Sequence, residues 1–447
     1  MKFAKKAVAL VGAAAMATSM AACGSDSSTT ATDTSSSDEK VTLSVWAWES
    51  TYTAAIKKFE EKYPNITIKL ENVGTNTDEY TALDNAISAG SGAPDVAQIE
   101  YYALPQYAIK GNLLNIADKG ASDYKDFYTP GTWSSVNYND GIYGLPMDSG
   151  PMAFFYNKAV FDKAGIKEAP ATWDEFYEDA KLIRKVDSYI TSDSGDAGFY
   201  DSMVWQAGGT PFKTTGTDKV SINLTDDAGA KKFTELWQKM IDEDLIDTKT
   251  TGWTDEWNRG MNDGSIAGLL TGAWMPANLL SGAPDAAGDW RVAQLPQYSE
   301  GETANSENGG SSLAILSSTE KADAAYKFVD FMSHDRSSID TRVEGGAFPA
   351  DTETLEDSDF LSKTTLKNAD GDEVDYFGGQ KYNEVLAKAA ENVTSGYQFL
   401  PFEIYARGIY GDTAGAAFTG KTTLAKGVES WQSKLKEYAT QQGFTVE

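Results

Sequence analysis

Strand-like and helix-like segments alternate along this chain, and that alternation limits the folds open to it. Residues 41–45 alternate apolar and polar side chains, as a half-buried strand does. In residues 52–63 the large apolar side chains recur at spacings of four, three and four, which places them on one helix face. Pro64 ends that helix, and residues 66–70 alternate again. A strand, a helix and a second strand within about 30 residues predict a βαβ unit.

The alternation extends over the rest of the chain. Residues 78–89 have a helical pattern, a Gly- and Pro-containing segment interrupts it, and residues 95–99 form the next expected strand. Thr172 and Glu175 have the spacing of a capping box at the start of a further helix. This alternation predicts α/β sheets covered by helices, and the length predicts two domains or more. Later stripes of apolar residues at helical spacing cover 233–241, 322–332 and 424–438. Trp237 and Trp431 lie on two of these stripes and are expected to be core residues.

The N-terminus has the layout of a secretory signal peptide. Three lysines precede a short apolar stretch at residues 7–15, and small residues then precede Cys23, the only cysteine in the chain. The pattern resembles the lipobox of bacterial lipoproteins, with Met20 where leucine is usual. The resemblance implies that residues 1–22 are removed and that Cys23 becomes the lipidated first residue. The alternative is a free thiol inside a segment that is cut away.

Residues 24–40 are rich in Ser, Thr and Asp and contain almost nothing apolar. Such a segment cannot bury enough surface to offset the entropy of ordering, so residues 23–40 are expected to form a lipidated, disordered tether. No later run approaches the ~20 apolar residues of a membrane span. We therefore expect a protein that is lipid-anchored to the cell membrane on its extracytoplasmic face and does not cross the membrane.

The formal net charge of -28 excludes two classes of partner. A surface this acidic repels nucleic acid and anionic lipid, and it suits a neutral or cationic ligand. His334 is the only histidine, which leaves little material for nucleophilic catalysis or a zinc site. Residues 370–375 are acid-rich, but Val374 stands where a calcium loop needs an oxygen ligand, so we expect a polar turn. The sequence predicts no cofactor, no metal and no catalytic residue.

Several short segments together resemble extracellular solute-binding protein family 1, the maltose-binding-like group. They occur in the family's order between residue 41 and about residue 350, and the last hundred residues fit by helix pattern only. The segments are 59–66, 92–96, 141–146 with 155–158 and 170–176, 261–267 with 272–274, 309–310 before 313–316, and 346–349.

The resemblance implies a two-lobed, type II periplasmic-binding-protein-like fold, in which two α/β sheet domains are joined by a three-crossover hinge with a ligand groove between them. It also implies a monomer that captures an oligosaccharide by hinge closure and delivers it to the transmembrane subunits of an ABC-type importer. The expected N-terminal lobe is 41–149 plus 312–345, the C-terminal lobe is 150–311 plus 346–447, and the crossovers are near 148–152, 309–312 and 345–348.

Aromatic and acidic residues beyond expected strand ends are the first candidates for ligand contact. Aromatic side chains make up 12% of the chain, and flat rings stack on the apolar faces of sugars while carboxylates accept their hydroxyls. Trp48 and Glu49 follow the first expected strand, and Glu100 and Tyr101 follow the strand that ends at Ile99. Ligands of open α/β sheets lie beyond the carboxyl ends of the strands, so these four are predicted to contact ligand.

Further candidates come from the resemblance and from position. Asp148 lies in the first crossover, where the family commonly places an acid that accepts sugar hydroxyls, and Trp274 matches the position of a stacking aromatic. The remaining candidates, near helix ends or in the later crossovers, are Trp205, Trp253, Trp257, Gly310 and Phe348.

Two alternatives stay open at this stage. Glu100 and Asp148 across a groove also describe the carboxylate pair of a glycosidase, although no hydrolase motif is present and we expect no enzyme. Acids with aromatics also suit a cationic amine, so a polyamine-binding protein is the second alternative.

Overall fold

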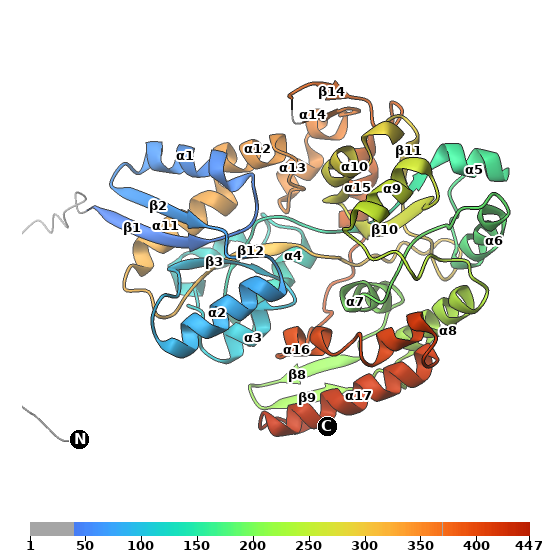
Figure 1. The fold of residues 1–447 in the computed structure, drawn as a ribbon. Helices are drawn as coiled ribbons and strands as arrows, with labels where there is room; N and C mark the ends of the chain where they lie inside the picture. Colours follow the sequence, from blue (N-terminus) through green and yellow to red (C-terminus); the bar gives the residue numbers. More distant parts are fainter. Residues whose placement is uncertain (1–39, 369) are drawn as a thin grey trace, which may run out of the picture. The chain divides into compact units, whose positions relative to one another are not determined.

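A five-stranded sheet in the order β2-β1-β3-β12-β6 organises the first lobe of the protein (Figure 1). The computed structural model describes residues 40–368 and 370–447. The predicted signal peptide, Cys23 and the tether up to residue 39 lie outside the described residues. The five strands are β1 (Val41–Trp46), β2 (Ile66–Glu71), β3 (Val96–Glu100), β6 (Leu145–Pro146) and β12 (Ser311–Ile315).

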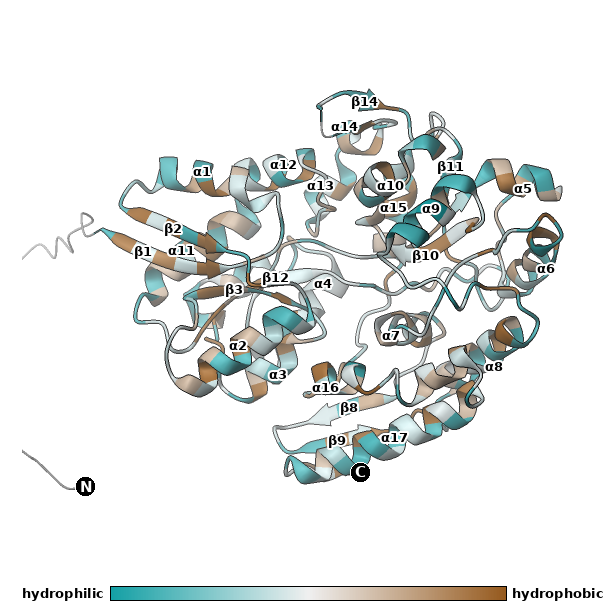
Figure 2. Ribbon diagram, in the orientation of Figure 1, coloured by the Kyte–Doolittle hydropathy of each residue, from teal (hydrophilic) through white to brown (hydrophobic). Residues whose placement is uncertain are grey.

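The predicted βαβ unit is confirmed. β1 runs parallel to β2 and to β3, while the late strand β12 runs antiparallel to both β3 and β6. Between β1 and β2, helix α1 (Tyr52–Lys62) buries Tyr52, Ile56 and Phe59 against the sheet and ends before Pro64. Figure 2 shows strands β1 to β3 mostly apolar and the outer faces of the helices mostly hydrophilic, as expected for an amphipathic covering layer.

Further short elements complete the first lobe. The helices are α2 (Thr77–Ala89), α3 (Leu104–Ile109), α4 (Pro130–Ser135), α11 (Ala322–His334) and α12 (Arg336–Glu344), with 3-10 turns η1 (Ala117–Lys119) and η2 (Ala121–Tyr124) and the hairpin β4 (Asn137–Tyr138) and β5 (Gly141–Ile142).

The second lobe is built around an antiparallel sheet in the order β10-β7-β11. Its strands are β7 (Met152–Asn157), β10 (Gly268–Gly272) and β11 (Trp290–Ala293). Successive side chains of a strand point to opposite faces, and Phe154 and Phe155 of β7 are fully buried in two different apolar clusters. Helices therefore cover both faces of this sheet.

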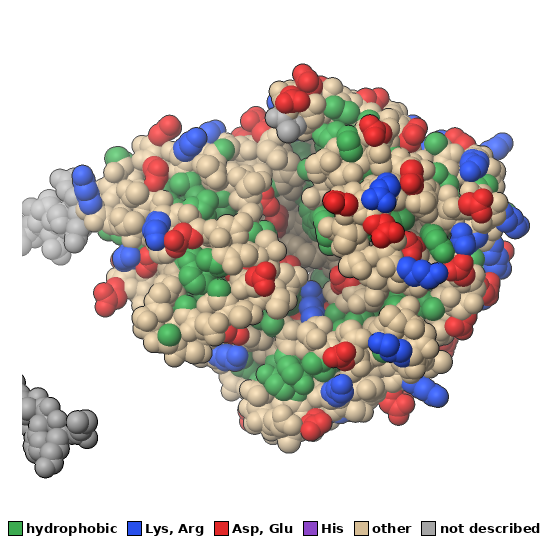
Figure 3. All heavy atoms as spheres, viewed as in Figure 1, with side chains coloured by type: hydrophobic (Ala, Val, Ile, Leu, Met, Phe, Trp, Pro, Cys, Tyr) green, Lys and Arg blue, Asp and Glu red, His purple; other side chains and the backbone are tan. Residues whose placement is uncertain are grey.

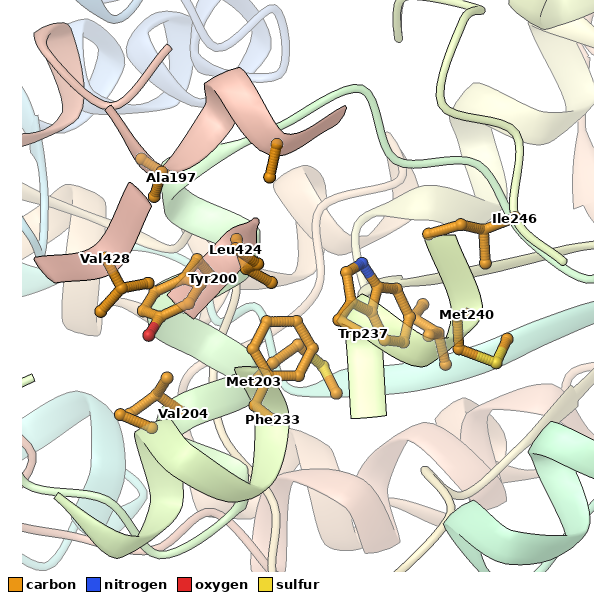
Figure 4. Close-up of a cluster of buried hydrophobic side chains, with 14 of the residues drawn as sticks. Ala197, Tyr200, Met203, Val204, Phe233, Trp237, Met240, Ile246, Leu424 and Val428 are labelled. Atoms are coloured by element: carbon orange, nitrogen blue, oxygen red, sulfur yellow. The ribbon is translucent and has the colours of Figure 1, made fainter. Parts of the chain in front are cut away.

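The larger of the two clusters packs helices α7 (Ala197–Gln206), α8 (Ala228–Asp242) and α17 (Leu424–Gln441) together (Figure 4). Trp237 and Trp431 are fully buried in it, so their prediction as core residues is confirmed. The indole N–H of Trp237 donates to Asp193 Oδ2 at 2.8 Å, which satisfies the one polar group of that side chain.

The other elements of the second lobe are short. Its helices are α5 (Lys158–Ala164), α6 (Trp173–Arg184), α9 (Asp255–Asp263), α10 (Met275–Gly282), α13 (Thr352–Glu356), α14 (Ser358–Leu361), α15 (Tyr382–Glu391) and α16 (Glu403–Gly408), with 3-10 turns η3 (Pro284–Ala286) and η4 (Ala414–Thr419). The strands β8 (Phe212–Thr215), β9 (Lys219–Ile222) and β15 (Thr445–Val446) form one small sheet, and β13 (Leu366–Lys367) pairs with β14 (Glu373–Val374).

The capping box predicted from the sequence is confirmed at the start of α6. Thr172 Oγ1 accepts a hydrogen bond from the Glu175 N–H at 3.2 Å, and Glu175 Oε2 accepts one from the Thr172 N–H at 3.2 Å. Among the described residues, no helix combines the length and the apolar character needed to cross a membrane.

Three chain segments run side by side where the lobes meet. The Asn308 N–H donates to the Gly150 carbonyl at 2.8 Å, and the Ser149 N–H donates to the Phe348 carbonyl at 3.2 Å. The third segment, around Phe348, keeps contact with the first lobe over several residues. Beyond Phe348, the Ala350 carbonyl still accepts a hydrogen bond from Thr129 of that lobe at 3.1 Å. These backbone contacts fix the two lobes at one junction.

Candidate ligand-binding site

A cavity of about 740 Å³ opens where the two lobes meet, and we call it the cleft. Figure 3 shows this face of the molecule hollowed between the lobes, with acidic side chains around the hollow. The residues lining the cleft come from strand ends, loops, the crossovers and helices of both lobes. They are Trp48, Glu49, Thr75, Asn76, Thr77, Glu100, Tyr102, Asp148, Gly195, Asp196, Ala197, Gly198, Trp253, Trp274, Asn278, Asn308, Gly309, Gly310, Ser311, Ile404, Arg407 and Gly408.

The loop after β1 is held in the cleft by Gln98 of β3. The side-chain carbonyl of Gln98 accepts hydrogen bonds from the backbone N–H groups of Trp48 and Glu49, at 3.1 and 3.2 Å. The Gln98 amide in turn donates to Ser311 Oγ at 2.9 Å. One buried side chain therefore ties the β1 loop to β12, and Trp48 and Glu49 have a fixed support.

Glu100 lies at the end of β3 and is held by Tyr80 of α2. The Tyr80 hydroxyl donates to Glu100 Oε2 at 3.1 Å and accepts a hydrogen bond from the Glu100 N–H at 2.9 Å. Burial raises the pKa of the Glu100 carboxyl, and the positive charge of Arg407 opposes that rise. Glu100 is thus a half-buried acceptor with a defined orientation.

Asp148 lies in the first crossover and is bonded to the start of β12. Its Oδ1 accepts hydrogen bonds from the Ser311 N–H at 2.5 Å and from Ser311 Oγ at 3.0 Å. Burial, with the neighbouring charge of Glu49, raises the pKa of Asp148 to about 7.

Tryptophans form the opposite wall, on the second lobe. The Trp274 indole N–H donates to the Asn308 carbonyl at 2.7 Å, which fixes that ring. The Trp253 ring lies 5.6 Å from the Trp274 ring, at an interplanar angle of 30°. Trp253 is 62% exposed and has a φ of 65°, so this ring stands on a strained loop. Flat rings of this kind can stack on a sugar face.

Two glycines of the second crossover let the chain pass close to aromatic rings. Gly310 has a φ of 86°, and a Cβ there would lie 2.5 Å from the Tyr101 ring. Gly309 has a φ of 84°, and a Cβ there would lie 3.0 Å from Trp274 Nε1. Both conditions, a left-handed backbone and no space, require glycine at this junction.

The structure brings seven of the eleven predicted ligand-binding residues to the cleft. The seven that line it are Trp48, Glu49, Glu100, Asp148, Trp253, Trp274 and Gly310. The other four, which do not line it, are Tyr101, Trp205, Trp257 and Phe348.

All four of those side chains are buried. Tyr101 is buried, and its hydroxyl donates to the Asp148 carbonyl at 2.7 Å. Trp205 packs face to face on Tyr397 and donates to the Thr394 carbonyl, instead of facing the cleft from a helix end as expected. Phe348 is buried in the core of the second lobe.

Trp257 lines a second cavity, of about 350 Å³, that adjoins the cleft. The lining residues that the two cavities share are Gly195, Asp196, Trp253, Trp274 and Asn308. The Trp257 indole N–H donates to Ser192 Oγ at 2.9 Å, and its ring lies 5.2 Å from the Trp253 ring.

The sequence reasoning missed several residues of the site. Gln98 resembles any buried strand residue, and Asn308 resembles any loop residue, so neither carried a signal. Asp196 could have been noticed as the N-cap of α7, because Asp is favoured there. Arg407 lies in the last hundred residues, where the sequence resembles the family by helix pattern only. Among the described residues, no cluster of three or more His, Cys, Asp or Glu has an arrangement that could hold a metal ion.

A family model described as bacterial extracellular solute-binding protein matches residues 47–337 of this chain. The chain belongs to that family. A curated relative, the lactose-binding protein of Rhizobium radiobacter, is 27% identical over 308 residues, which cover 64% of this chain and 69% of that protein. The predicted family membership is confirmed.

Solved structures of binding proteins are similar along most of the chain. One is the ABC transporter associated binding protein of B. animalis subsp. lactis Bl-04 in complex with β-1,6-galactobiose, with 59% identity and a TM-score of 0.82, covering 91% of this chain and 99% of that one. Another is the galacto-N-biose-/lacto-N-biose I-binding protein of Bifidobacterium longum with lacto-N-biose, with 26% identity and a TM-score of 0.78 over the same shares. The predicted two-lobed, type II fold is confirmed.

Proposed function

We propose that this protein captures a short neutral galactoside, of the β-1,6-galactobiose class, in the cleft and presents it to an ABC-type importer. The observation that carries the proposal is the pairing of tryptophan rings with carboxylates around one cavity of about 740 Å³. Ring faces suit the apolar faces of pyranoses, and carboxylates accept hydroxyl protons. The 59% identity to a protein in complex with β-1,6-galactobiose supports this choice of sugar.

Capture requires the lobes to move about the crossovers. Glycines at the second crossover, at φ values near 85°, and the short first crossover are places where a hinge can absorb backbone rotation. The closed form would bury Trp274 and Asp148 against the sugar from opposite sides.

The test is calorimetric titration of the protein with β-1,6-galactobiose, lacto-N-biose, lactose, maltose and spermidine. We expect saturable, micromolar or tighter binding of β-1,6-galactobiose and no measurable heat with spermidine. If spermidine binds and none of the saccharides does, the polyamine alternative replaces the proposal. Chromatography of the sugar after prolonged incubation with the protein tests the hydrolase alternative. We expect the disaccharide to remain intact, because the family consists of binding proteins.

Attachment to the membrane is a separate proposal and rests on the sequence alone. We propose that Cys23 carries the lipid and that the folded part lies on the extracytoplasmic face as a monomer. Replacing Cys23 by serine should move the protein from the membrane fraction to the soluble fraction, while binding in the cleft stays unchanged. Light scattering of the purified protein tests the monomer.

A further inference from the structure

Arg407 is the only Lys or Arg among the described residues that line the cleft. The same lining contains four acidic residues, namely Glu49, Glu100, Asp148 and Asp196. A single cation in an acidic ligand cleft has to be balanced and held in place, because a buried charge without partners is costly. The contacts of Arg407 reach into both lobes.

On the second lobe, Arg407 is anchored to α7 and to its own helix. Arg407 Nη2 lies 3.2 Å from Asp201 Oδ2, and Nε lies 3.6 Å from Glu403 Oε1. Asp201 and Glu403 are almost fully buried. A Cβ at Gly198 would lie 3.0 Å from Arg407 Nη1, so a glycine on α7 leaves space for the guanidinium. The side chain therefore has one defined position.

On the first lobe, the guanidinium stacks on Tyr102, just beyond β3. Arg407 Cζ lies 3.6 Å from the centroid of the Tyr102 ring, within the range of a cation–π interaction. The Tyr102 hydroxyl donates to Asn76 Oδ1 at 2.7 Å, and the Tyr102 ring meets the Tyr80 ring edge-on at 5.9 Å. Tyr80 is the residue that bonds Glu100. Contacts thus connect Arg407 to Glu100 across the lobe boundary.

We propose that Arg407 is a positioning residue for ligand binding. Anchored on the second lobe and stacked on Tyr102 of the first, it places its positive charge near Glu100 and, through Tyr102 and Tyr80, orients that side chain as a hydroxyl acceptor. This inference rests on the proposed function, because it assigns a role in binding the galactoside. If Arg407 has this role, ligand affinity depends on the contact between Arg407 of the second lobe and Tyr102 of the first.

Several titratable groups surround Arg407 and Glu100, and each enters the pH dependence. From the first lobe these are Glu79 and Tyr80 of α2, with Tyr102 beyond β3. From the second lobe they are Asp196, Asp201, Tyr397 and Glu403, and Glu307 of the second crossover shares a small cavity with Arg407. Burial raises the pKa of Glu79 to about 8, with a further rise from the charge of Glu100.

The experiment measures the Kd for β-1,6-galactobiose between pH 5 and pH 9 in Arg407→Gln, Arg407→Lys, Glu100→Gln and the double variant with both glutamines. The matched control is Arg184→Gln. Arg184 also stacks on a tyrosine, Tyr189, at 4.0 Å and pairs with Asp244 at 2.8 Å, but it does not line the cleft. Thermal melts of every variant show whether it folds.

We expect Arg407→Gln to weaken binding by roughly tenfold at pH 7. Loss of the positive charge also moves the acid limb of the Kd profile to higher pH, because Glu100 then protonates more easily. Arg407→Lys keeps the charge but loses the planar stack, so its Kd rises while its pH profile stays in place. In the Glu100→Gln background the pH shift caused by Arg407→Gln disappears.

Three results would overturn the inference. One is an Arg407→Gln profile that overlays the wild-type profile. Another is a pH shift that persists in the Glu100→Gln background, and the third is an equal loss of affinity in the Arg184→Gln control. If Arg407→Gln fails to fold, Tyr102→Leu takes its place and must weaken binding while Arg184→Gln does not. Saccharide binding by the wild-type protein is measured before any variant. If the wild type binds no saccharide, that result refutes the proposed function and not the role of Arg407.

Discussion

The two walls of the cleft are built differently. The first-lobe wall and the crossovers carry carboxylates, Glu100 and Asp148, that follow strand ends and are bonded to neighbouring strands or helices. The second-lobe wall carries tryptophans on a loop and at a helix start, and Trp253 is 62% exposed. The first-lobe carboxylates are held by hydrogen bonds and titrate, whereas the tryptophan rings of the second-lobe wall, which lie beside Asp196 and Arg407, carry no charge. Mutations in one wall or the other should therefore separate two contributions to binding: hydrogen bonds from the carboxylates to the sugar hydroxyls, and stacking of the tryptophan rings on the sugar.

The largest expected effect concerns the buried carboxylate between the walls. Glu307 accepts a hydrogen bond from Ser149 Oγ at 2.9 Å, and burial raises its pKa from 4.5 to about 8. The folded protein holds this proton more tightly than the unfolded chain does. The stabilisation is therefore complete below pH 4.5 and is lost as the pH rises through about 8.

We expect the Glu307→Gln variant not to show this loss of stability at high pH. Between pH 5 and pH 9 the wild-type free energy of unfolding should fall relative to the variant by on the order of 3 kcal/mol. Urea titrations at both pH values measure it, with the exposed Glu429→Gln as control. Parallel pH dependences for wild type and Glu307→Gln would assign the titration to other groups.

The next effect tests the aromatic wall. Trp274→Ala removes the ring that is fixed by Asn308, and we expect the Kd for β-1,6-galactobiose to rise by an amount equivalent to about 2 kcal/mol. Calorimetry measures the change, and Trp274→Phe should recover part of it because a flat ring remains. An unchanged Kd in Trp274→Ala would show that this ring does not contribute to ligand binding.

A smaller effect tests the acidic wall. Because burial raises the pKa of Asp148 to about 7, ligand affinity should decline as the pH falls from 8 to 5 and the carboxylate becomes protonated. Asp148→Asn should weaken binding at pH 8 by about tenfold, which is about 1.4 kcal/mol, and flatten that part of the profile. Trp274→Ala should keep the wild-type pH dependence. If both variants lose it, the two walls do not act separately.

The smallest effect concerns the strained loop. Trp253 has a φ of 65°, which costs a non-glycine residue about 1 kcal/mol. Trp253→Gly should relieve that strain and leave the melting temperature unchanged or slightly higher, while the Kd rises by a few-fold because the outer ring is lost. Trp253→Ala is the comparison, since it removes the ring but keeps the strain. A marked loss of stability in Trp253→Gly would mean that the ring supports the loop.

The four predicted site residues that do not line the cleft show the limits of reasoning along the chain. Tyr101 follows Glu100 directly, yet neighbouring residues beyond a strand end point in different directions, and Tyr101 supports Asp148 from behind. Trp205 was predicted from its place near a helix end and Phe348 from its place in a crossover, but both side chains are buried. Pattern alone cannot separate an aromatic that lines a cavity from one that packs in a core.

The sequence by itself determined the βαβ unit, the capping box, several later helices and the family, because these depend on local spacing and on short ordered segments. It also located Trp48, Glu100 and Asp148, because strand ends and crossovers can be read along the chain. Only the tertiary structure decided that Gln98 supports the β1 loop, that Asn308 fixes Trp274, and that Arg407 reaches Tyr102. Those contacts join residues from 34 to more than 300 positions apart, and no local pattern encodes such pairings.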